Sequence, residues 1–180
     1  GDVRFDLNGP SLDALDGTAA LDVTRLRFGE LAFSETRLRS EATDGVFQID
    51  LASALRGVRL NATGRVAPFA ETPTYDERTR FRSLDIGRFV ENSESTTAQT
   101  SDLNGVLRVQ GSSFSADEAN LTATLELQPS SLNNAPVEGG QLIAQLEQPN
   151  LSVNGTLQAG GGTIALNGSA TLGEVLRYRL

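Results

Sequence analysis

Cysteine, histidine, tryptophan, methionine and lysine are all absent from this chain of 180 residues, so its 15 basic residues are all arginine. Without cysteine or histidine the chain has no thiolate nucleophile, no imidazole base, no Ser-His-Asp triad and no Cys/His zinc site. The lack of a disulfide framework is compatible with the cytosol and with a large periplasmic protein stabilised by sheet hydrogen bonds. We therefore expect a protein that is not an enzyme and that uses no metal and no cofactor.

Long apolar runs and a basic charge balance are missing as well. No segment approaches the roughly 18 to 20 consecutive apolar residues that a transmembrane helix requires. The net charge is −8 and the sequence pI is near 4.6. Nucleic acids need a basic footprint on the protein that binds them, so we expect no nucleic-acid partner.

The sequence also shows no start methionine and no signal-like segment at its beginning. Strand-like alternation begins at Val3 and still continues over residues 175–180. We therefore expect this chain to be a segment of a longer protein in which the sheet continues on both sides.

The dominant pattern that is present is an alternation of apolar and polar residues in short segments. Such segments occur at residues 3–7, 47–51, 107–109 and 164–166, and glycine, asparagine, aspartate and proline separate them. Alternation with a period of two is typical of strands with one buried face. The pairs Asp44-Gly45 and Asn154-Gly155 indicate tight hairpin turns, because these residue types readily adopt positive φ values. The sequence therefore predicts an all-β fold made mostly of antiparallel sheet.

The chain divides into two similar halves on its sequence pattern. Residues 1–68 and 101–180 each contain strands, an intervening hairpin and a closing strand that ends near an asparagine and a glycine. Residues 69–100 contain few β-branched apolar residues and a Ser/Thr-rich stretch, so we expect a connector there. Within it, Ser83 is a suitable N-cap and residues 83–90 have helical spacing, which predicts a short helix. Such repetition favours an array of stacked units.

Recurring short motifs link these strands to a known family. A step of leucine, a polar residue and glycine begins an amphipathic strand at residues 15–21 and again at 103–109. Glycine-bearing hairpins and glycine-closed strands follow, as in residues 139–146 and 151–168, and residues 84–90 look like a Leu-Asp-Leu element followed by a short helix. In these features the chain resembles, over about residues 1–175, the bacterial AsmA-like and TamB-like envelope proteins, whose repeating β-groove domains bridge the inner and outer membranes.

The resemblance implies a curved sheet that forms a groove or taco-like half-barrel with an apolar interior. Such a groove would shield phospholipid acyl chains during transport between the inner and outer membranes and in outer-membrane biogenesis. An aliphatic lining suits this task, because hydrocarbon transfer is driven by apolar area and needs no directional contacts. The resemblance further implies the periplasm of a Gram-negative bacterium, a parent protein anchored in the inner membrane, and outer-membrane assembly proteins as partners.

The candidate groove lining consists of apolar residues at alternating positions of the expected strands. These residues are Phe5, Leu21, Val23, Phe33, Phe47, Ile49, Leu60, Leu107, Val109, Leu125, Leu127, Leu142, Leu146, Val153, Leu157, Ile164 and Leu166. The same pattern also fits a closed β-sandwich, in which two sheets cover each other's apolar faces. In that alternative the chain is a structural or adhesive module of a surface protein without a lipid ligand. A carbohydrate-binding module is disfavoured, because the chain has no tryptophan and only two tyrosines to stack on sugars.

Several acidic residues and one glycine run have simpler interpretations than a ligand site. The acidic residues lack the spacing of a calcium loop, so we expect solvated turn residues rather than calcium ligands or a glycosidase pair. Residues 160–162 are three glycines without a following lysine or helical pattern, so we expect a hairpin tip rather than a phosphate cradle. The acidic residues concerned are Asp2, Asp6, Asp13, Asp16, Asp117 and Glu118.

Overall fold

The structure is a computed structural model that describes residues 1–180 except 29–30, 56, 89–99, 116–117, 172–176 and 180. The described residues form 12 strands and two short 3-10 helices, and most of the strands are ten residues or longer. In chain order the elements are β1 (Asp2–Asn8), η1 (Leu12–Ala14), β2 (Asp16–Phe28), β3 (Leu31–Thr43), β4 (Val46–Leu55), β5 (Val58–Ala67), β6 (Thr74–Leu84), η2 (Ile86–Arg88), β7 (Ser101–Ser112), β8 (Asn120–Leu132), β9 (Ala135–Glu147), β10 (Asn150–Ala159), β11 (Gly162–Thr171) and β12 (Arg177–Arg179).

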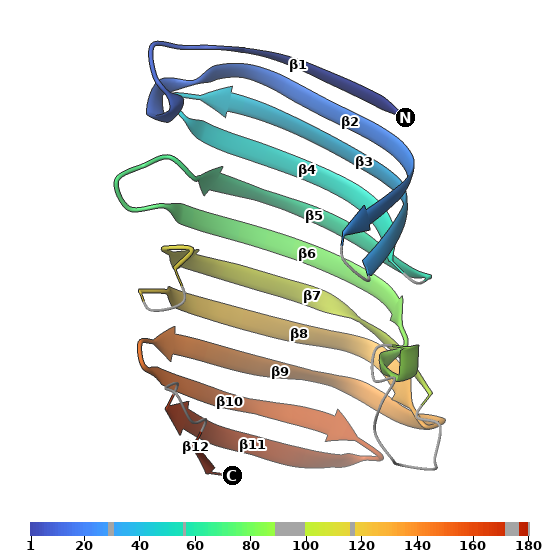
Figure 1. Cartoon of the computed structure of the whole chain (residues 1–180). Helices are drawn as coiled ribbons and strands as arrows, with labels where there is room; N and C mark the ends of the chain where they lie inside the picture. Colours follow the sequence, from blue (N-terminus) through green and yellow to red (C-terminus); the bar gives the residue numbers. More distant parts are fainter. Residues whose placement is uncertain (29–30, 56, 89–99, 116–117, 172–176, 180) are drawn as a thin grey trace.

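All the described strands belong to one antiparallel sheet, and each strand pairs with the next one in the sequence. The spatial order therefore runs from β1 to β12 without a crossover, as Figure 1 shows from the blue strand to the red one. The sheet does not close on itself, and the described part of the chain has no second sheet packed on it. The expected all-β, mostly antiparallel fold is confirmed, whereas the closed-sandwich alternative is wrong.

The hairpin turns use residues with positive φ. Asp44 and Gly45 join β3 to β4 with φ values of 47° and 70°, as the sequence predicted. Gly160 and Gly161 join β10 to β11 with φ values of 58° and 74°. The turn expected at Asn154-Gly155 is wrong, because both residues lie inside β10.

Gly155 lies within β10 at a point where the backbone of β9 comes very close. A Cβ atom at this position would lie 2.3 Å from the carbonyl oxygen of Gln141 and 2.9 Å from the Cα atom of Leu142 on β9. Glycine in a strand often marks such a close approach of a neighbouring backbone. The sequence shows the glycine but does not distinguish this role from a turn.

The region expected to be a connector contains a full strand of the sheet. Strand β6 pairs with β5 on one side and with β7 on the other, so the expectation of a connector over residues 69–100 is corrected for residues 74–84. The helix η2 lies within the short helix expected over residues 83–90, as a single 3-10 turn, and residues 89–90 lie outside the described residues. The division of the chain into two repeats stays a prediction.

The strand register sorts the side chains onto two faces of very different character. Leu21, Leu38 and Leu51 lie directly opposite one another on β2, β3 and β4. Leu107, Leu125 and Leu142 do the same on β7, β8 and β9. These leucines, together with every second residue along the same strands, lie on one face of the sheet, which we call the apolar face. The other, which we call the polar face, carries arginines and carboxylates such as those of the pairs Arg39↔Asp50 and Arg65↔Asp76.

Few residues of this sheet are fully enclosed. The buried hydrophobic residues among those described are Ala42, Val58, Ala62, Phe81, Val106 and Val137. The solvent-accessible area is 12279 Å², whereas a compact protein of 19.1 kDa exposes about 8,400 Å². The larger area is that of a single-layer sheet, both of whose faces meet solvent. Phe5, with 75% of its area exposed, and Ile164, with 50%, show that apolar side chains remain uncovered.

Irregular pairings lie along one end of the strands and bend the sheet. The register shifts between Ser34 and Arg37 on β3, between Phe81 and Leu84 on β6, and between Asp102 and Asn104 on β7. A further shift occurs on β10 at Gln158. β-bulges bend a strand and increase its twist. In Figure 1 the strands curve strongly at this end, where β2 and β3 fold over and where η2 lies.

A candidate apolar groove

The apolar face is hollowed beside the row of bulges. The hollow has a volume of about 470 Å³, and all of its lining residues except Thr79 are apolar. Strands β4 to β8 provide the floor, while Leu84, Ile86 and Leu103 come from the region around η2. The full lining is Leu55, Val58, Leu60, Thr79, Phe81, Leu84, Ile86, Leu103, Leu107, Leu125 and Leu127.

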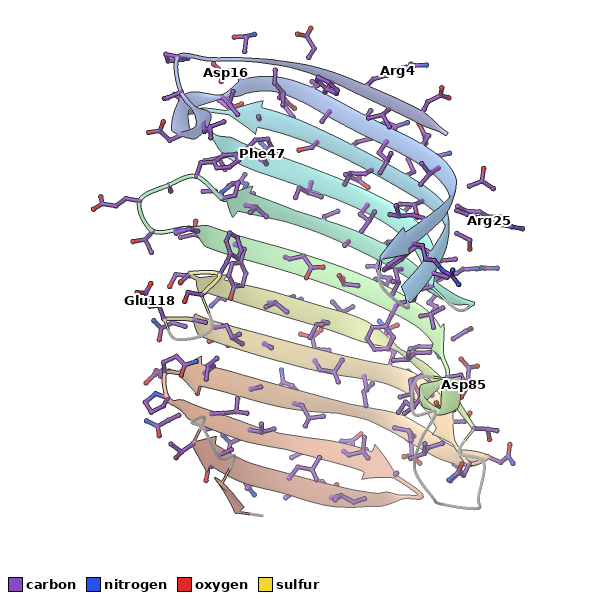
Figure 2. All side chains as sticks on the ribbon, viewed as in Figure 1. Arg4, Asp16, Arg25, Phe47, Asp85 and Glu118 are labelled. Atoms are coloured by element: carbon purple, nitrogen blue, oxygen red, sulfur yellow. The ribbon has the colours of Figure 1, made fainter. Side chains whose placement is uncertain are left out.

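Hydrogen bonds fix the segment that brings Ile86 to the hollow. The Ile86 N–H donates to the Ser101 hydroxyl oxygen at 2.7 Å, and that hydroxyl donates to the Leu84 carbonyl oxygen at 3.2 Å. The Asp85 carboxylate accepts hydrogen bonds of 3.2 Å from the N–H groups of Gly87 and Ser101. Asp85 lies beside the helical turn in Figure 2. These polar groups are satisfied locally, so the apolar side chains are free to face the groove.

All the residues expected to line a groove lie on the apolar face by strand register. Leu60, Leu107, Leu125 and Leu127 border the hollow itself. The others extend the same face across the sheet, from the pair Phe5↔Ala19 at one edge to the pair Leu157↔Ile164 near the other. Lipid contact by these residues stays a prediction.

Phe47 shows how the apolar face continues at the opposite end of the strands. Its ring packs edge-on against the Phe69 ring, with the two centroids 6.2 Å apart. In Figure 2 Phe47 lies over the sheet, whereas the labelled charged residues Asp16, Arg25 and Glu118 lie at its rims. The aromatic pair extends the apolar surface away from the hollow.

Sequence reasoning missed several residues that line the hollow. Phe81 was missed because it lies in the region expected to be a connector, although Tyr75, Thr79 and Phe81 alternate there with Arg78 and Arg80. That alternation was the signal that could have found β6. Leu84, Ile86 and Leu103 lie beyond the bulges, where the period of two is interrupted.

The apolar face also contains a satisfied polar pair. The hydroxyls of Thr36 on β3 and Ser53 on β4 share a hydrogen bond of 2.8 Å, and both residues are buried. The Ser53 hydroxyl also approaches the Ser34 carbonyl oxygen at 3.4 Å. Thr36 lies in the β3 bulge, so this pair ties the bulge to the neighbouring strand.

Glu77 is the exception on the apolar face. Register places it between Gly64 on β5 and Val109 on β7. Burial raises the pKa of the Glu77 carboxyl above its usual range, because the charged form loses water there. The Thr79 hydroxyl donates a hydrogen bond to Glu77 Oε1.

The polar face has a larger but mixed-charge hollow of about 800 Å³. Its lining includes Arg39, Asp50, Asp76 and Arg78. Nearby, the Asp22 carboxylate lies 2.6 Å from Arg39 Nη2 and 3.2 Å from Arg37 Nε, and the hydrogen bond from Arg39 is the main cause that lowers the pKa of Asp22. A surface of alternating charges and hydroxyls is an unfavourable environment for an acyl chain, because its polar groups would lose water without gaining partners. The apolar face is therefore the candidate site.

The acidic residues weighed at the start of the chain stay at its surface. Asp2, Asp6, Asp13 and Asp16 are exposed, as is Glu118, and Asp117 lies outside the described residues. In the part of the chain that the structure describes, no three carboxylates gather as they would around a metal ion. None of the helices in that part is long and apolar enough to cross a membrane.

Comparison of the sequence with models of protein families and with curated proteins, and of the fold with solved structures, found no match. Support for a function therefore comes from the geometry and chemistry of the chain itself and from the family resemblance of its motifs.

Proposed function

We propose that this chain shields the acyl chains of phospholipids in an open apolar groove. The groove acts without covalent chemistry, by replacing the contact between hydrocarbon and water with contact between hydrocarbon and aliphatic side chains. At about 0.8 kcal/mol per CH₂ group, an acyl chain in water carries a large free-energy cost that such a groove removes. The protein would then be a lipid-transport segment rather than an enzyme.

The observation that carries this proposal is the uncovered apolar face. A monomeric protein rarely exposes an apolar patch larger than a few hundred Å² unless the patch has a ligand or partner. Here Val3, Phe5 and Ile164 on this face are exposed, and no second layer covers the sheet in the described part of the chain. The apolar hollow of about 470 Å³ lies within the volume range of known small-ligand sites.

The cellular setting belongs to the same proposal and is supported by the resemblance of the motifs to AsmA-like and TamB-like proteins. In that setting the groove is part of a periplasmic protein of a Gram-negative bacterium, and its parent is anchored in the inner membrane. Its lipid would pass between the inner and outer membranes in outer-membrane biogenesis. Outer-membrane assembly proteins are the partners that this setting implies.

The test is whether the chain, purified from a Gram-negative bacterium, carries phospholipid when it is analysed by native mass spectrometry. Leu142 and Ile143 are adjacent on β9 and point to opposite faces, since Leu142 lies opposite Leu125 and Ile143 lies opposite Thr124. Both side chains are half-buried. Leu142→Asp and Ile143→Asp therefore introduce the same charge into the same strand on different faces.

We expect bound phospholipid in the unmodified chain and in Ile143→Asp, and its loss in Leu142→Asp. Circular dichroism must show that both variants remain folded as β-sheet. A parent chain without lipid, or equal retention of lipid by both variants, would overturn the proposal. If a lipid-free chain instead forms a dimer, the apolar face is a packing surface between copies.

A further inference from the structure

Glu77 is unusual because of where it lies. Among the register-paired positions of the apolar face on the described strands β4 to β9, it carries the only acidic or basic side chain. Its strand, β6, is the sixth of the 12 strands, so the carboxyl lies in the middle of the sheet. A local break in an otherwise consistent pattern is expected at functional positions.

In the described sheet, neither β5 nor β7 offers the Glu77 carboxylate a countercharge on this face. On this face β5 presents Ala62, Gly64 and Val66, and β7 presents Leu107, Val109 and Gly111 around it. The adjacent residues Asp76 and Arg78 point to the polar face. The nearest titratable group on this face is the phenol of Tyr75, whose ring stacks on Phe114 with centroids 5.5 Å apart.

Gly64 lies opposite Glu77 on β5 and has no side chain to cover it. A Cβ atom at Gly64 would come within 3.2 Å of the Glu77 Cβ atom and 2.6 Å of the Asp76 carbonyl oxygen. A larger residue would therefore crowd the Glu77 side chain. With glycine at this position, β5 places no side chain over Glu77 at the paired position.

Thr79 connects the carboxyl to the apolar hollow. Its hydroxyl donates to Glu77 Oε1, and Thr79 is also the one polar residue in the lining of the hollow of about 470 Å³. An apolar tail in the hollow would thus end beside Glu77. The two features together form a site with an apolar compartment and a single acceptor at its border.

We propose that Glu77 binds the ammonium group of an amphiphile whose apolar tail occupies the adjacent hollow. A primary ammonium supplies the positive charge that the surroundings of Glu77 do not provide, and it adds hydrogen-bond donors to the one from Thr79. A carboxylate or phosphate in that position would instead meet a like charge. The groove therefore selects its ligand by headgroup charge as well as by its hydrocarbon tail. This inference depends on the proposed binding of acyl chains in the groove.

The experiment compares amphiphiles with equal tails and different headgroups. Dodecylamine and dodecanoate below their micelle concentrations, and dodecanol below its solubility limit, are titrated into the delipidated chain by isothermal calorimetry. The proteins are the unmodified chain, Glu77→Gln and Glu126→Gln. Glu126 is a matched control, because it lies on β8 on the polar face, where its carboxylate pairs with Arg108.

We expect the unmodified chain and Glu126→Gln to bind dodecylamine at least tenfold more tightly than dodecanol, and dodecanoate more weakly than dodecanol. Glu77→Gln should bind dodecanol as before and lose the preference for the amine. If the unmodified chain binds all three ligands equally, the role of Glu77 is overturned and the groove function stands. If the chain binds none of them, the groove function itself fails.

A pH series separates headgroup recognition from a general effect of charge. The preference for dodecylamine should disappear as the pH falls and Glu77 becomes protonated, while binding of dodecanol stays constant. The preference must persist at neutral pH in Glu126→Gln and be absent there in Glu77→Gln. A preference that persists unchanged in acid would contradict the assignment to Glu77.

Discussion

The two faces of strand β6 differ sharply in the side chains that they carry. On one face Tyr75, Thr79 and Phe81 extend the apolar surface, and on the other Arg78 and Arg80 point into water. Arginine at an exposed position is solvated and needs no covering layer, whereas exposed apolar area on this scale calls for a ligand or a partner. Exposed side chains on the polar face are therefore explained by solvation, whereas exposed side chains on the apolar face indicate a ligand or a partner. The three predictions below test this difference.

The largest expected effect comes from truncating the buried ring on β6. Phe81→Ala should lower the free energy of unfolding by about 3 kcal/mol, because it removes a large apolar side chain and leaves a cavity. Arg82→Ala, one residue further on and exposed on the polar face, should change it by no more than about 0.5 kcal/mol. Urea denaturation followed by circular dichroism measures both. If both variants lowered the free energy of unfolding equally, the hydrophobic core would not lie on the apolar face.

A smaller effect is expected where two backbones approach each other on the apolar face. Gly155→Ala should cost about 1 to 3 kcal/mol, because the new methyl group meets the Gln141 carbonyl oxygen and forces the strands to shift. Gly162→Ala is the control, since the nearest atom to a Cβ there lies 3.7 Å away. The same denaturation measurement compares the two variants. A Gly155→Ala protein as stable as Gly162→Ala would contradict the close approach of β9 and β10.

The smallest effects concern the pH dependence of stability, and they should have opposite signs on the two faces. The pKa of Glu77 is raised by burial, so the folded state loses stability as the pH rises from the unfolded-state pKa through the folded-state pKa. Glu77→Gln should remove this loss and be more stable than the parent at neutral pH.

The pKa of Asp22 is lowered chiefly by its hydrogen bond with Arg39, so its stabilising contribution is fully present above the unfolded-state pKa. That contribution disappears as the pH falls through the folded-state pKa. Asp22→Asn should therefore be less stable than the parent at neutral pH and equal to it in strong acid. Thermal unfolding over a pH series checks both variants. If the two variants change stability in the same direction at neutral pH, the contrast between the faces is wrong.

The sequence could predict the faces of the sheet because alternation is a local property. Leu125 and Leu127, or Val153 and Leu157, share a face whatever strand lies beside them. The turn at Asp44-Gly45 was equally local and was predicted correctly. Gly155 was misinterpreted because its role depends on the neighbouring strand β9, which sequence spacing does not reveal.

The hollow itself could not be predicted in this way. It depends on bulges that change the alternation at Phe81, Leu84 and Leu103, and bulges arise from pairing with neighbouring strands. Strand β6 was missed because Asp76, Glu77 and several arginines hide its few apolar residues. Closed-sandwich packing could not be rejected from the sequence either, since both folds require one apolar face on each strand.

The strictly sequential strand order has a consequence for how such a protein can change over evolutionary time. Because each strand contacts chiefly the strands before and after it in the chain, duplication of one hairpin would lengthen the sheet by two strand spacings, or about 10 Å. No existing pair would need to be broken apart except the one at the insertion point. The length of such a sheet across its strands is then set by the number of hairpins and changes in steps of one hairpin.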